Sequence, residues 1–236
     1  MFSTHQLKGL SLPEKTLCLT FDDGPGVTHG DGPGPKTLRL AEYLHEQDIS
    51  ATFFVVGEFV ARYPFLLPEV TKLGHIVGNH TYTHPNMPRL FAKGGDLVAE
   101  IKRTNELIID WIPGNTVFFR APYGEWLPEI SDKLNEAMDD DHNYIGPFYW
   151  DVEGRDWAFW QDDRSAEECA RAYLNEITRM DHGIVLLHDS IADNVQAREN
   201  QRTFEMVKIL VPRLKSLGYR FAGLDEIPND HKTNPI

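Results

Sequence analysis

The sequence predicts one α/β domain built on a parallel sheet, because short apolar runs alternate with helical patterns along its whole length. No linker or low-complexity tract divides the chain, so we expect a single domain over residues 1–236. Strands that alternate with helices pair in parallel through right-handed crossovers. They can close into a barrel, which is the arrangement we favour, or form an open doubly wound sheet.

Seven runs rich in β-branched and aromatic residues predict the strands. They span residues 17–21, 51–57, 75–79, 117–122, 144–150, 183–189 and 219–224. In a parallel α/β fold, the carboxyl ends of such strands form the functional face. Polar residues that directly follow these runs are therefore the candidates for chemistry.

Apolar residues spaced three or four apart predict helices whose stripes face the sheet. Two such stripes are Leu97, Ile101, Thr104, Ile108 and Trp111, and Phe204, Val207, Val211, Leu214 and Leu217. A third helix is expected over residues 165–180, where Ser165 and Glu168 have the spacing of a capping box. Gly218 is expected to end the last helix, because glycine readily adopts the left-handed conformation found there.

The composition restricts the class of partner. A formal net charge of -13 argues against binding to nucleic acid or to an anionic membrane surface. No stretch approaches the roughly 20 apolar residues that a membrane span requires. The N-terminus lacks a cationic start followed by an apolar run, so we expect a cytoplasmic chain or a mature exported form. Cys18 and Cys169 are expected to be buried thiols.

The first strand ends in two adjacent carboxylates, Asp22 and Asp23, followed by Gly24 and Pro25. Like charges this close are unfavourable without a cation or a shared proton. The alternative is an ordinary polar turn, in which both side chains accept hydrogen bonds from backbone amides. This segment alone does not separate the two interpretations.

The third strand ends at His80, and His84 follows at a spacing that one helical turn would bring onto the same side. Imidazole pairs of this spacing commonly bind zinc and similar ions, although two histidines can also be plain hydrogen-bond partners. Asp23 could supply a third ligand. Such a set leaves coordination positions open for water and substrate.

The remaining strand ends point to the same face. The fourth ends at Arg120, which could orient a carboxylate bidentately or form a surface salt bridge. The fifth runs into acids and aromatics over residues 150–157, and the sixth ends at His188, which alone would be read as structural. Five strand ends that each deliver polar groups to one face favour a catalytic site. Asp48, Asp110 and residues 139–141 are expected on the opposite rim as solvated surface.

These residues resemble the motifs of the polysaccharide deacetylase family, also called the NodB-homology or carbohydrate esterase 4 group. The matching segments, in the family's order, are TFDDGP (20–25), HTYTH (80–84), RAPYG (120–124), DW (156–157) and LLHD (186–189). The resemblance implies a distorted (β/α)7 barrel. It also implies one divalent ion, zinc first, with cobalt, nickel or manganese as alternatives, bound by Asp23, His80 and His84.

The resemblance further implies hydrolysis of the acetamide of N-acetylated sugars, such as chitin oligomers or peptidoglycan, by a metal-bound water. The implied roles are Asp22 as general base, His188 as general acid, Arg120 and Asp156 as their partners, and Trp157 and Leu186 as walls of an acetyl pocket. In the reaction that we expect, a backbone N–H near Tyr123 helps to stabilise the oxyanion.

Three alternative functions remain open at the level of the sequence. They are an O-acetyl esterase acting on acetylated glycans, an amidohydrolase acting on a small amide, and a non-catalytic carbohydrate-binding barrel that keeps the metal. The chain also departs from the family pattern twice. Glu153 stands where the fourth motif usually begins with aspartate, and the glycine-rich link over residues 26–34 is longer than usual. A longer rim loop is expected to reshape the substrate groove.

Overall fold

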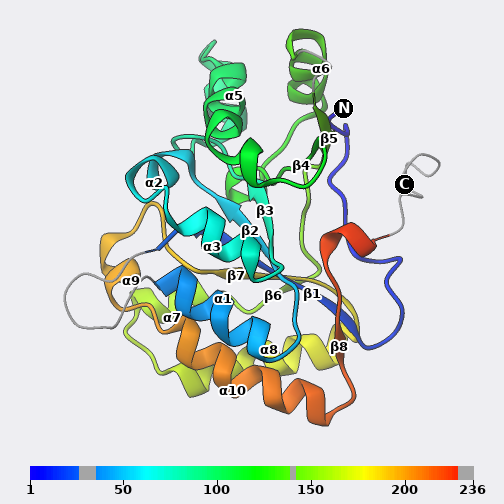
Figure 1. Ribbon diagram of the computed structural model, residues 1–236, viewed down its shortest axis with the longest axis vertical. Coiled ribbons are helices and arrows are strands. Elements are labelled where there is room, and N and C mark those ends of the chain that lie inside the picture. Colours follow the sequence, from blue (N-terminus) through cyan, green and yellow to red (C-terminus); the bar gives the residue numbers. More distant parts are fainter. Residues whose placement is uncertain (27–35, 139–141, 228–236) are drawn as a thin grey trace.

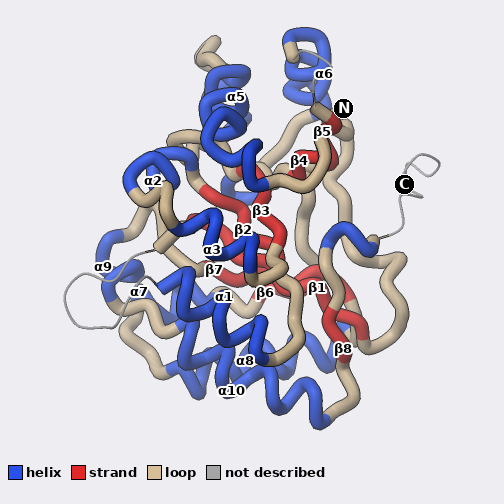
Figure 2. The backbone as a smooth tube through the Cα atoms, viewed as in Figure 1, coloured by secondary structure: helices blue, strands red, loops and turns tan. Residues whose placement is uncertain are grey.

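The computed structural model describes residues 1–26, 36–138 and 142–227, and it contains a parallel sheet covered by helices (Figure 1, Figure 2). The strands are β1 (Thr16–Gly24), β2 (Thr52–Val55), β3 (Ile76–Asn79), β4 (Thr116–Phe118), β5 (Asn143–Ile145), β6 (Val152–Glu153), β7 (Gly183–His188) and β8 (Arg220–Phe221). The central sheet has the order β3-β2-β1-β7-β6, with β8 paired to the start of β1, and β4 pairs with β5. Every one of these pairings is parallel, as predicted.

Each of the seven predicted runs overlaps one strand, so the order of these seven strands was correctly predicted. The strand β6 was not predicted. It has only two residues, Val152 and Glu153, which is too short for an alternating pattern to be visible in the sequence.

Two further contacts close the sheets into a distorted barrel rather than an open doubly wound sheet. Asn79 at the end of β3 pairs with Phe119 just after β4, which joins the two sheets. On the other side, Asp151 N, in the segment between β5 and β6, donates to Ile184 O of β7 at 2.9 Å, which joins that segment to the central sheet. Residues 3–7, the N-terminal strap, lie along the same segment. There Leu7 pairs with Phe148, and Tyr149 N donates to Leu7 O at 2.7 Å.

Ten helices and three short 3-10 turns occupy the described residues. They are α1 (Lys36–Glu46), α2 (Gly57–Arg62), α3 (Leu66–Lys72), α4 (Met87–Ala92), α5 (Leu97–Ile108), α6 (Pro128–Ala137), α7 (Asp156–Gln161), α8 (Ala166–Met180), α9 (Val195–Glu199), α10 (Thr203–Ser216), η1 (Ile109–Trp111), η2 (Pro122–Gly124) and η3 (Leu224–Glu226). The capping box of Ser165 and Glu168 forms as predicted at the start of α8. Gly218, at φ 83°, follows the end of α10, also as predicted.

The predicted apolar stripes are buried except at their ends. Ile101 and Ile108 in α5, and Val211 in α10, are fully buried. Trp111 and Leu217 were expected to face the sheet, and this was wrong, because their exposed fractions are 38% and 45%. Trp111 lies in η1 after α5 has ended, and Leu217 is the C-terminal cap of α10, so neither continues its helix face.

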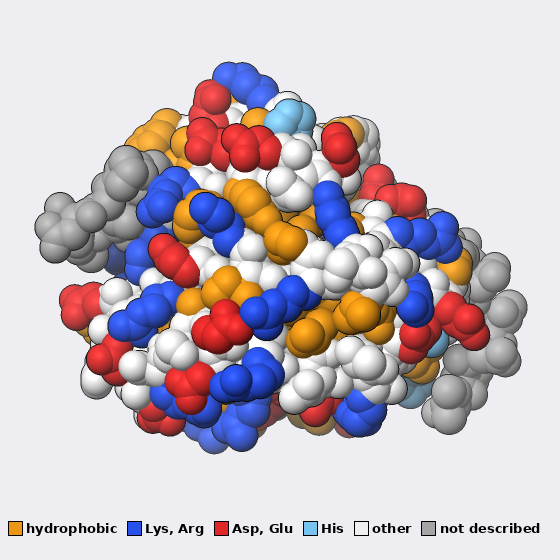
Figure 3. Space-filling view, turned by 90° about the horizontal axis from the view of Figure 1, so that it is seen from below, with side chains coloured by type: hydrophobic (Ala, Val, Ile, Leu, Met, Phe, Trp, Pro, Cys, Tyr) orange, Lys and Arg blue, Asp and Glu red, His pale blue; other side chains and the backbone are white. Residues whose placement is uncertain are grey.

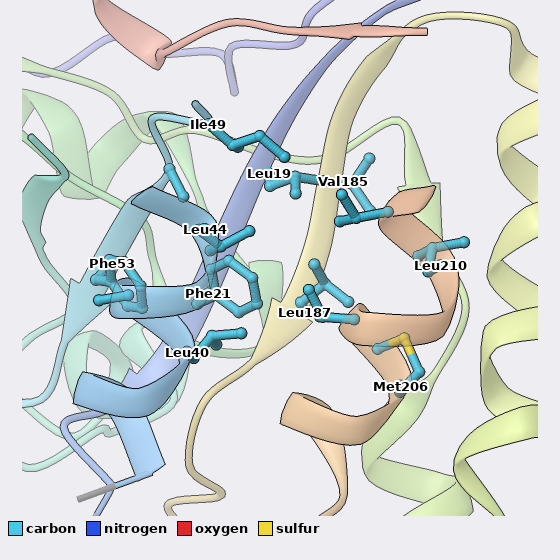
Figure 4. Packing of buried hydrophobic residues seen from close by; sticks show 14 of the residues in the cluster. Leu19, Phe21, Leu40, Leu44, Ile49, Phe53, Val185, Leu187, Met206 and Leu210 are labelled. Atoms are coloured by element: carbon cyan, nitrogen blue, oxygen red, sulfur yellow. The ribbon is translucent and has the colours of Figure 1, made fainter. Parts of the chain in front are cut away.

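The main core lies between the central sheet and the helices α1 and α10 (Figure 4). Leu19 and Phe21 from β1 and Val185 and Leu187 from β7 pack there against Leu40 and Leu44 of α1 and Met206 and Leu210 of α10. The ring of Phe21 also stacks on Phe53 of β2, with centroids 5.1 Å apart. Cys18 and Cys169 are buried free thiols, as predicted.

Side-chain alternation then places the other residues of β1 and β7 inside the barrel. Since successive side chains of a strand point to opposite faces, Leu19 and Phe21 face the helices while Thr20 and Asp22 face the barrel interior. The strands β1 and β7 pair in a register that sets Asp22 beside His188. Two titratable side chains are thus brought together at the carboxyl ends of adjacent strands.

The outer surface of the lower helix layer in Figure 1 carries a mixture of basic, acidic and hydrophobic side chains (Figure 3). Exposed ion pairs such as Arg213–Glu167 and Arg179–Glu176 occur on α8 and α10, and pairs of this kind contribute little to stability. Among the described residues, no helix is both long enough and apolar enough to cross a bilayer.

The predicted surface acids on the opposite rim are partly described. Asp48, between α1 and β2, and Asp110, in η1 before β4, are exposed at the amino-terminal side of their strands, as expected. Residues 139–141 and the glycine-rich link beyond Gly26 lie outside the described residues.

Replacing Leu210 by alanine should lower the free energy of unfolding by about 2–5 kcal/mol, because it leaves a cavity in the core between α10 and β7. Urea unfolding followed by circular dichroism measures this loss. Leu217→Ala at the exposed end of the same helix is the matched control and should change stability by less than about 0.5 kcal/mol. Equal losses in the two variants would contradict the assignment of this core.

Candidate active site

A cavity of about 480 Å³ opens at the carboxyl ends of β1, β3 and β7. The predicted residues that line it are Asp22, Asp23, His80, His84, Tyr123, Trp157, Leu186 and His188. The other two predicted residues, Arg120 and Asp156, are fully buried next to it, each bonded to a residue of the lining. The structure therefore brings all ten predicted site residues together.

A bulge at the end of β1 directs both adjacent carboxylates into this cavity. Consecutive strand residues would normally point to opposite faces, but the register of β1 against β2 shifts between Asp22 and Gly24. Asp23 sits in the bulge at φ 70°, a left-handed conformation that aspartate tolerates better than most residues. The two carboxylates can therefore act at one site, and the segment is more than a polar turn.

His80 and His84 face each other across a loop, with ring centroids 5.0 Å apart. The helical turn expected between them is absent, because Thr81 and His84 have φ angles of 69° and 58° and residues 80–86 form no helix. These left-handed residues fold the loop back so that the two rings converge. The expected proximity was therefore right, and the expected local structure was wrong.

Asp23, His80 and His84 form a buried cluster that could hold a metal ion. One potential ligand atom from each lies within 4.8 Å of the others. Asp23 Oδ1 is 3.1 Å from His84 Nε2 and 3.5 Å from His80 Nε2. The three potential ligand atoms point at a common position, which suits three protein ligands with further coordination positions left open.

The hydrogen bonds on the far sides of the two rings fit metal binding. His80 Nδ1 is 2.9 Å from the main-chain oxygen of Arg120, and His84 Nδ1 is 2.8 Å from Asp193 Oδ2. A carbonyl and a carboxylate only accept hydrogen bonds, so each Nδ1 must carry the proton. In the neutral rings this leaves the Nε2 lone pairs directed toward Asp23, as a metal would require.

The electrostatics of the cluster favour a positive charge at the same place. Burial lowers the pKa of His84, but the charge of Asp23 and the hydrogen bond to Asp193 outweigh burial and raise that pKa to about 10. Burial raises the pKa of Asp23, but His84 and His80 outweigh burial and hold the pKa well below its usual range. The cluster thus retains a carboxylate and attracts a cation.

Asp22 is held by Arg120 from inside the barrel. Arg120 Nη1 donates to Asp22 Oδ1 at 2.8 Å and to Thr20 Oγ1 at 2.7 Å. The other guanidinium nitrogens donate to the carbonyls of Phe148 and Tyr149, so the expected bidentate contact is replaced by a single one. Arg120 is fully buried, which rules out the surface salt bridge considered from the sequence. Asp22 Oδ2 remains directed toward His80, at 3.7 Å from Nε2.

His188 is held by Asp156, the first residue of α7. Asp156 Oδ1 is 2.7 Å from His188 Nδ1, and Asp156 Oδ2 accepts the main-chain N–H of His188 at 2.8 Å. Burial lowers the pKa of His188, but the charge of Asp156 and this hydrogen bond outweigh burial and raise it to about 9. In the absence of a metal, His188 is therefore a cation at neutral pH, with Nε2 free to face the cavity.

The walls of the cavity are apolar and aromatic. Leu186 from β7 and Trp157 from α7 line it as expected, and Trp150 adds a further half-buried ring. Tyr123 stands at the rim with a φ of 61° and an exposed fraction of 51%, and its ring centroid is 4.8 Å from that of His84. Glu153, the departure from the family pattern, also lines the cavity and is exposed.

Sequence reasoning missed Asp193, which bonds both His84 and Tyr123. Gln161, Ile191 and Asn194 of the cavity wall were also missed. The one available signal was that residues 189–194 directly follow a predicted strand on the functional face. Nothing in the sequence indicates that an acid 109 residues away would reach His84.

Comparison with known proteins agrees with the family resemblance that the sequence motifs show. A family model described as polysaccharide deacetylase matches residues 9–139. A chitooligosaccharide deacetylase of Rhizobium leguminosarum bv. trifolii is 30% identical over 218 residues, which cover 90% of this chain and 92% of the relative. The crystal structure of a peptidoglycan N-acetylglucosamine deacetylase, in complex with 4-naphthalen-1-yl-N-oxidanyl-benzamide, is similar with a TM-score of 0.71 and 25% identity, covering 93% and 90% of the two chains.

The fold is also shared with a protein described as inactive. A carbohydrate esterase 4 pseudoenzyme from Bacillus anthracis is similar with a TM-score of 0.66 and 22% identity, covering 91% of this chain and 65% of the other. At this identity the likeness concerns the fold alone. Activity therefore has to be argued from the side chains of the site.

In the metal-free protein, the imidazole of His188 should titrate near pH 9, and Asp156→Asn should lower its pKa, because only the weaker charges of Asp23 and Asp22 then oppose burial. Proton NMR of the histidine ring measures both values. Since the folded-state pKa is raised, the stabilisation from this pair is fully present below about pH 6.5 and is lost as the pH rises through about 9.

Asp132→Asn, on the exposed side of α6, is the control for the loss of one carboxylate and should leave the titration of His188 unchanged. An unaltered pKa of His188 in Asp156→Asn would show that Asp156 does not set the charge of this ring.

Proposed function

The chain belongs to the polysaccharide deacetylase family, and on this premise we propose that it hydrolyses the acetamide of N-acetylated sugars and releases acetate. The observation that carries the proposal is that the potential metal ligands lie between two separately held titratable groups. Asp22 is anchored by Arg120, and His188 is anchored by Asp156. A non-catalytic carbohydrate-binding barrel would need the metal ligands and the cavity but neither of these pairs.

The proposed cofactor is one divalent ion, zinc first, with cobalt, nickel or manganese able to replace it. Asp23, His80 and His84 would hold the ion through one carboxylate oxygen and two Nε2 atoms. When bound, it would polarise the acetamide carbonyl and lower the pKa of a water molecule.

Asp22 is the proposed general base. One of its carboxylate oxygens is held by Arg120, which leaves the other, directed toward His80, to take a proton from the attacking water. Because Arg120 is itself tied to Thr20 and to main-chain carbonyls, the position of the carboxylate does not depend on solvent. The base is therefore placed before substrate binds.

His188 is the proposed general acid. An amine is a poor leaving group until it is protonated, so the second half of the reaction needs a proton donor near the nitrogen. Asp156 accepts from Nδ1 and keeps the ring charged at neutral pH, which leaves Nε2–H as the donor toward the cavity. Asp22 and His188 are neighbours across β1 and β7, so the proposed acceptor and the proposed donor would both lie close to the reacting acetamide.

The remaining contacts would bind the acetyl group and its developing charge. The main-chain N–H of Tyr123 is the proposed donor to the oxyanion, a contribution typically worth about 3 kcal/mol. Leu186 and Trp157 form the apolar wall for the methyl group. Burial of the acetyl group against these side chains would exclude bulk water from the reacting carbonyl.

The proposed substrate class is a glycan that contains N-acetylglucosamine, such as chitin oligomers or peptidoglycan. The proposal follows the named activities of the two deacetylases, which act on chitooligosaccharides and on peptidoglycan. The half-exposed ring of Tyr123 and the partly buried ring of Trp150 at the cavity give a sugar apolar faces on which to stack.

The zinc-loaded protein should release acetate from N-acetylglucosamine oligomers, and removal of the metal with EDTA should abolish the release. Asp22→Asn should lower kcat by about 10²-fold or more, since the base is lost, while zinc content measured by mass spectrometry stays the same. His80→Ala is the contrasting variant and should lose zinc as well as activity.

Acetylated xylan assayed in parallel separates the alternatives. Acetate released only from xylan would replace the proposal by an O-acetyl esterase. Oligosaccharide binding without release of acetate from either polymer would indicate a non-catalytic barrel, and full activity in Asp22→Asn would contradict the assignment of the base.

A further inference from the structure

Asp193 forms hydrogen bonds at the cavity that have no role in the proposed reaction. It lies in the loop between β7 and α9, and its Oδ2 accepts hydrogen bonds from His84 Nδ1 at 2.8 Å and from the hydroxyl of Tyr123. Its side chain is 53% exposed, whereas that of His84 is 7% exposed. A half-exposed carboxylate, that of Asp193, is thus hydrogen-bonded to a buried potential metal ligand, His84.

The two potential histidine ligands are oriented by different kinds of group. His80 Nδ1 is bonded to the main-chain oxygen of Arg120, which no substitution removes. His84 Nδ1 is bonded to a side chain, Asp193. The loop that carries His84 is held at its main chain by Glu100, which accepts from the N–H groups of Tyr82 and Thr83, whereas the ring of His84 is bonded to the side chain of Asp193. Its orientation therefore depends on Asp193.

Asp193 itself is positioned by its own loop, residues 191–194. Arg198 of α9 donates to the main-chain oxygens of Ile191 and Ala192 at 2.6 Å and 2.7 Å. Asn194 caps α9 by accepting the N–H of Ala197 at 2.9 Å. In addition, Ala192 N donates to Asp23 Oδ2 at 2.8 Å. The same loop therefore contacts two of the three potential metal ligands.

The geometry excludes Asp193 as a fourth ligand of the same ion. Its oxygen is bonded to Nδ1, whereas Nε2 of the same ring faces Asp23. The two nitrogens point to opposite sides of the imidazole, so Asp193 lies behind the ring as seen from the ligand cluster. A carboxylate in this position fixes the ring and its tautomer and makes the coordinating nitrogen more basic.

We propose that Asp193 is a positioning residue for the metal ligand His84, and that the hydroxyl of Tyr123 helps to fix Asp193 in that role. The proposal rests on the metal site of the proposed function and deepens it. It assigns to loop 191–194 the support of two ligands, Asp23 through Ala192 N–H and His84 through the Asp193 carboxylate.

The test is the affinity for zinc, measured without substrate by competition with a chromogenic chelator. Asp193→Ala should weaken zinc binding about 10- to 100-fold, the usual effect of removing a carboxylate behind a histidine ligand. Asp193→Asn keeps an oxygen that can accept from Nδ1 but loses the charge, so its affinity should fall between the wild type and Asp193→Ala. Tyr123→Phe keeps the Asp193–His84 bond but removes the hydroxyl that helps to fix Asp193, so its zinc affinity should fall, by less than in Asp193→Ala.

Asp132→Ala on α6 is the control for the loss of an exposed carboxylate, and its zinc affinity should not change. Cobalt substitution adds a spectroscopic reading: the visible absorption bands should shift in Asp193→Ala and not in Asp132→Ala. Urea unfolding of each metal-free variant shows whether the fold is kept.

Wild-type zinc affinity in Asp193→Ala would overturn the proposal, and so would a loss of stability in the metal-free variant with unchanged affinity. Zinc binding without any deacetylase activity would remove the proposed function and leave this test valid. A wild-type protein that binds no zinc would overturn the metal site, and this proposal with it.

Discussion

The buried guanidinium of Arg120 is the feature on which both the fold and the site depend. A fully buried charge is stable only if its donors are satisfied, and here they meet Asp22, Thr20 and two main-chain carbonyls. These partners belong to β1 and to the segment before β6, so one side chain joins opposite parts of the barrel wall. The main-chain oxygen of the same residue orients His80. The proposed base, Asp22, and one proposed metal ligand, His80, are thus both held by Arg120.

Charge in the site is arranged in pairs that have different environments. Asp22 is paired with a guanidinium, that of Arg120, whereas His188 is paired with a carboxylate, that of Asp156. The first pairing holds one oxygen of the Asp22 carboxylate in place, and the second raises the pKa of the His188 imidazole to about 9. Two neighbouring groups on adjacent strands thus have partners of opposite charge, which is consistent with the proposed roles of one as proton acceptor and the other as proton donor.

The sequence predicted much of this because strands and their polar ends are local features. The seven strand runs and the capping box at Ser165 were predicted from pattern and spacing, and the ten residues expected at the site from pattern or from the resemblance lie together at or beside one cavity. What it could not predict arises from tertiary contacts. The two-residue β6 forms by pairing with β7, the turn between His80 and His84 is set by left-handed residues, and Asp193 acts across 109 positions. Local sequence patterns do not predict contacts between residues that are far apart in the chain.

The way in which the N-terminal strap, residues 3–7, is bound suggests that its own sequence can vary. Its pairing with residues 146–149 uses main-chain donors and acceptors, with Ser3 and Leu7 donating to Gly146 and Pro147 and Tyr149 donating back. Main-chain hydrogen bonds of this kind form with almost any side chain at these positions. They hold residues 146–149 in place, and the carbonyls of Phe148 and Tyr149 in this segment accept hydrogen bonds from Arg120. Most substitutions in the strap should therefore leave the position of Arg120 unchanged. The exception is next to the strap, at Phe2, whose ring packs against those of Phe119, Trp126 and Tyr144.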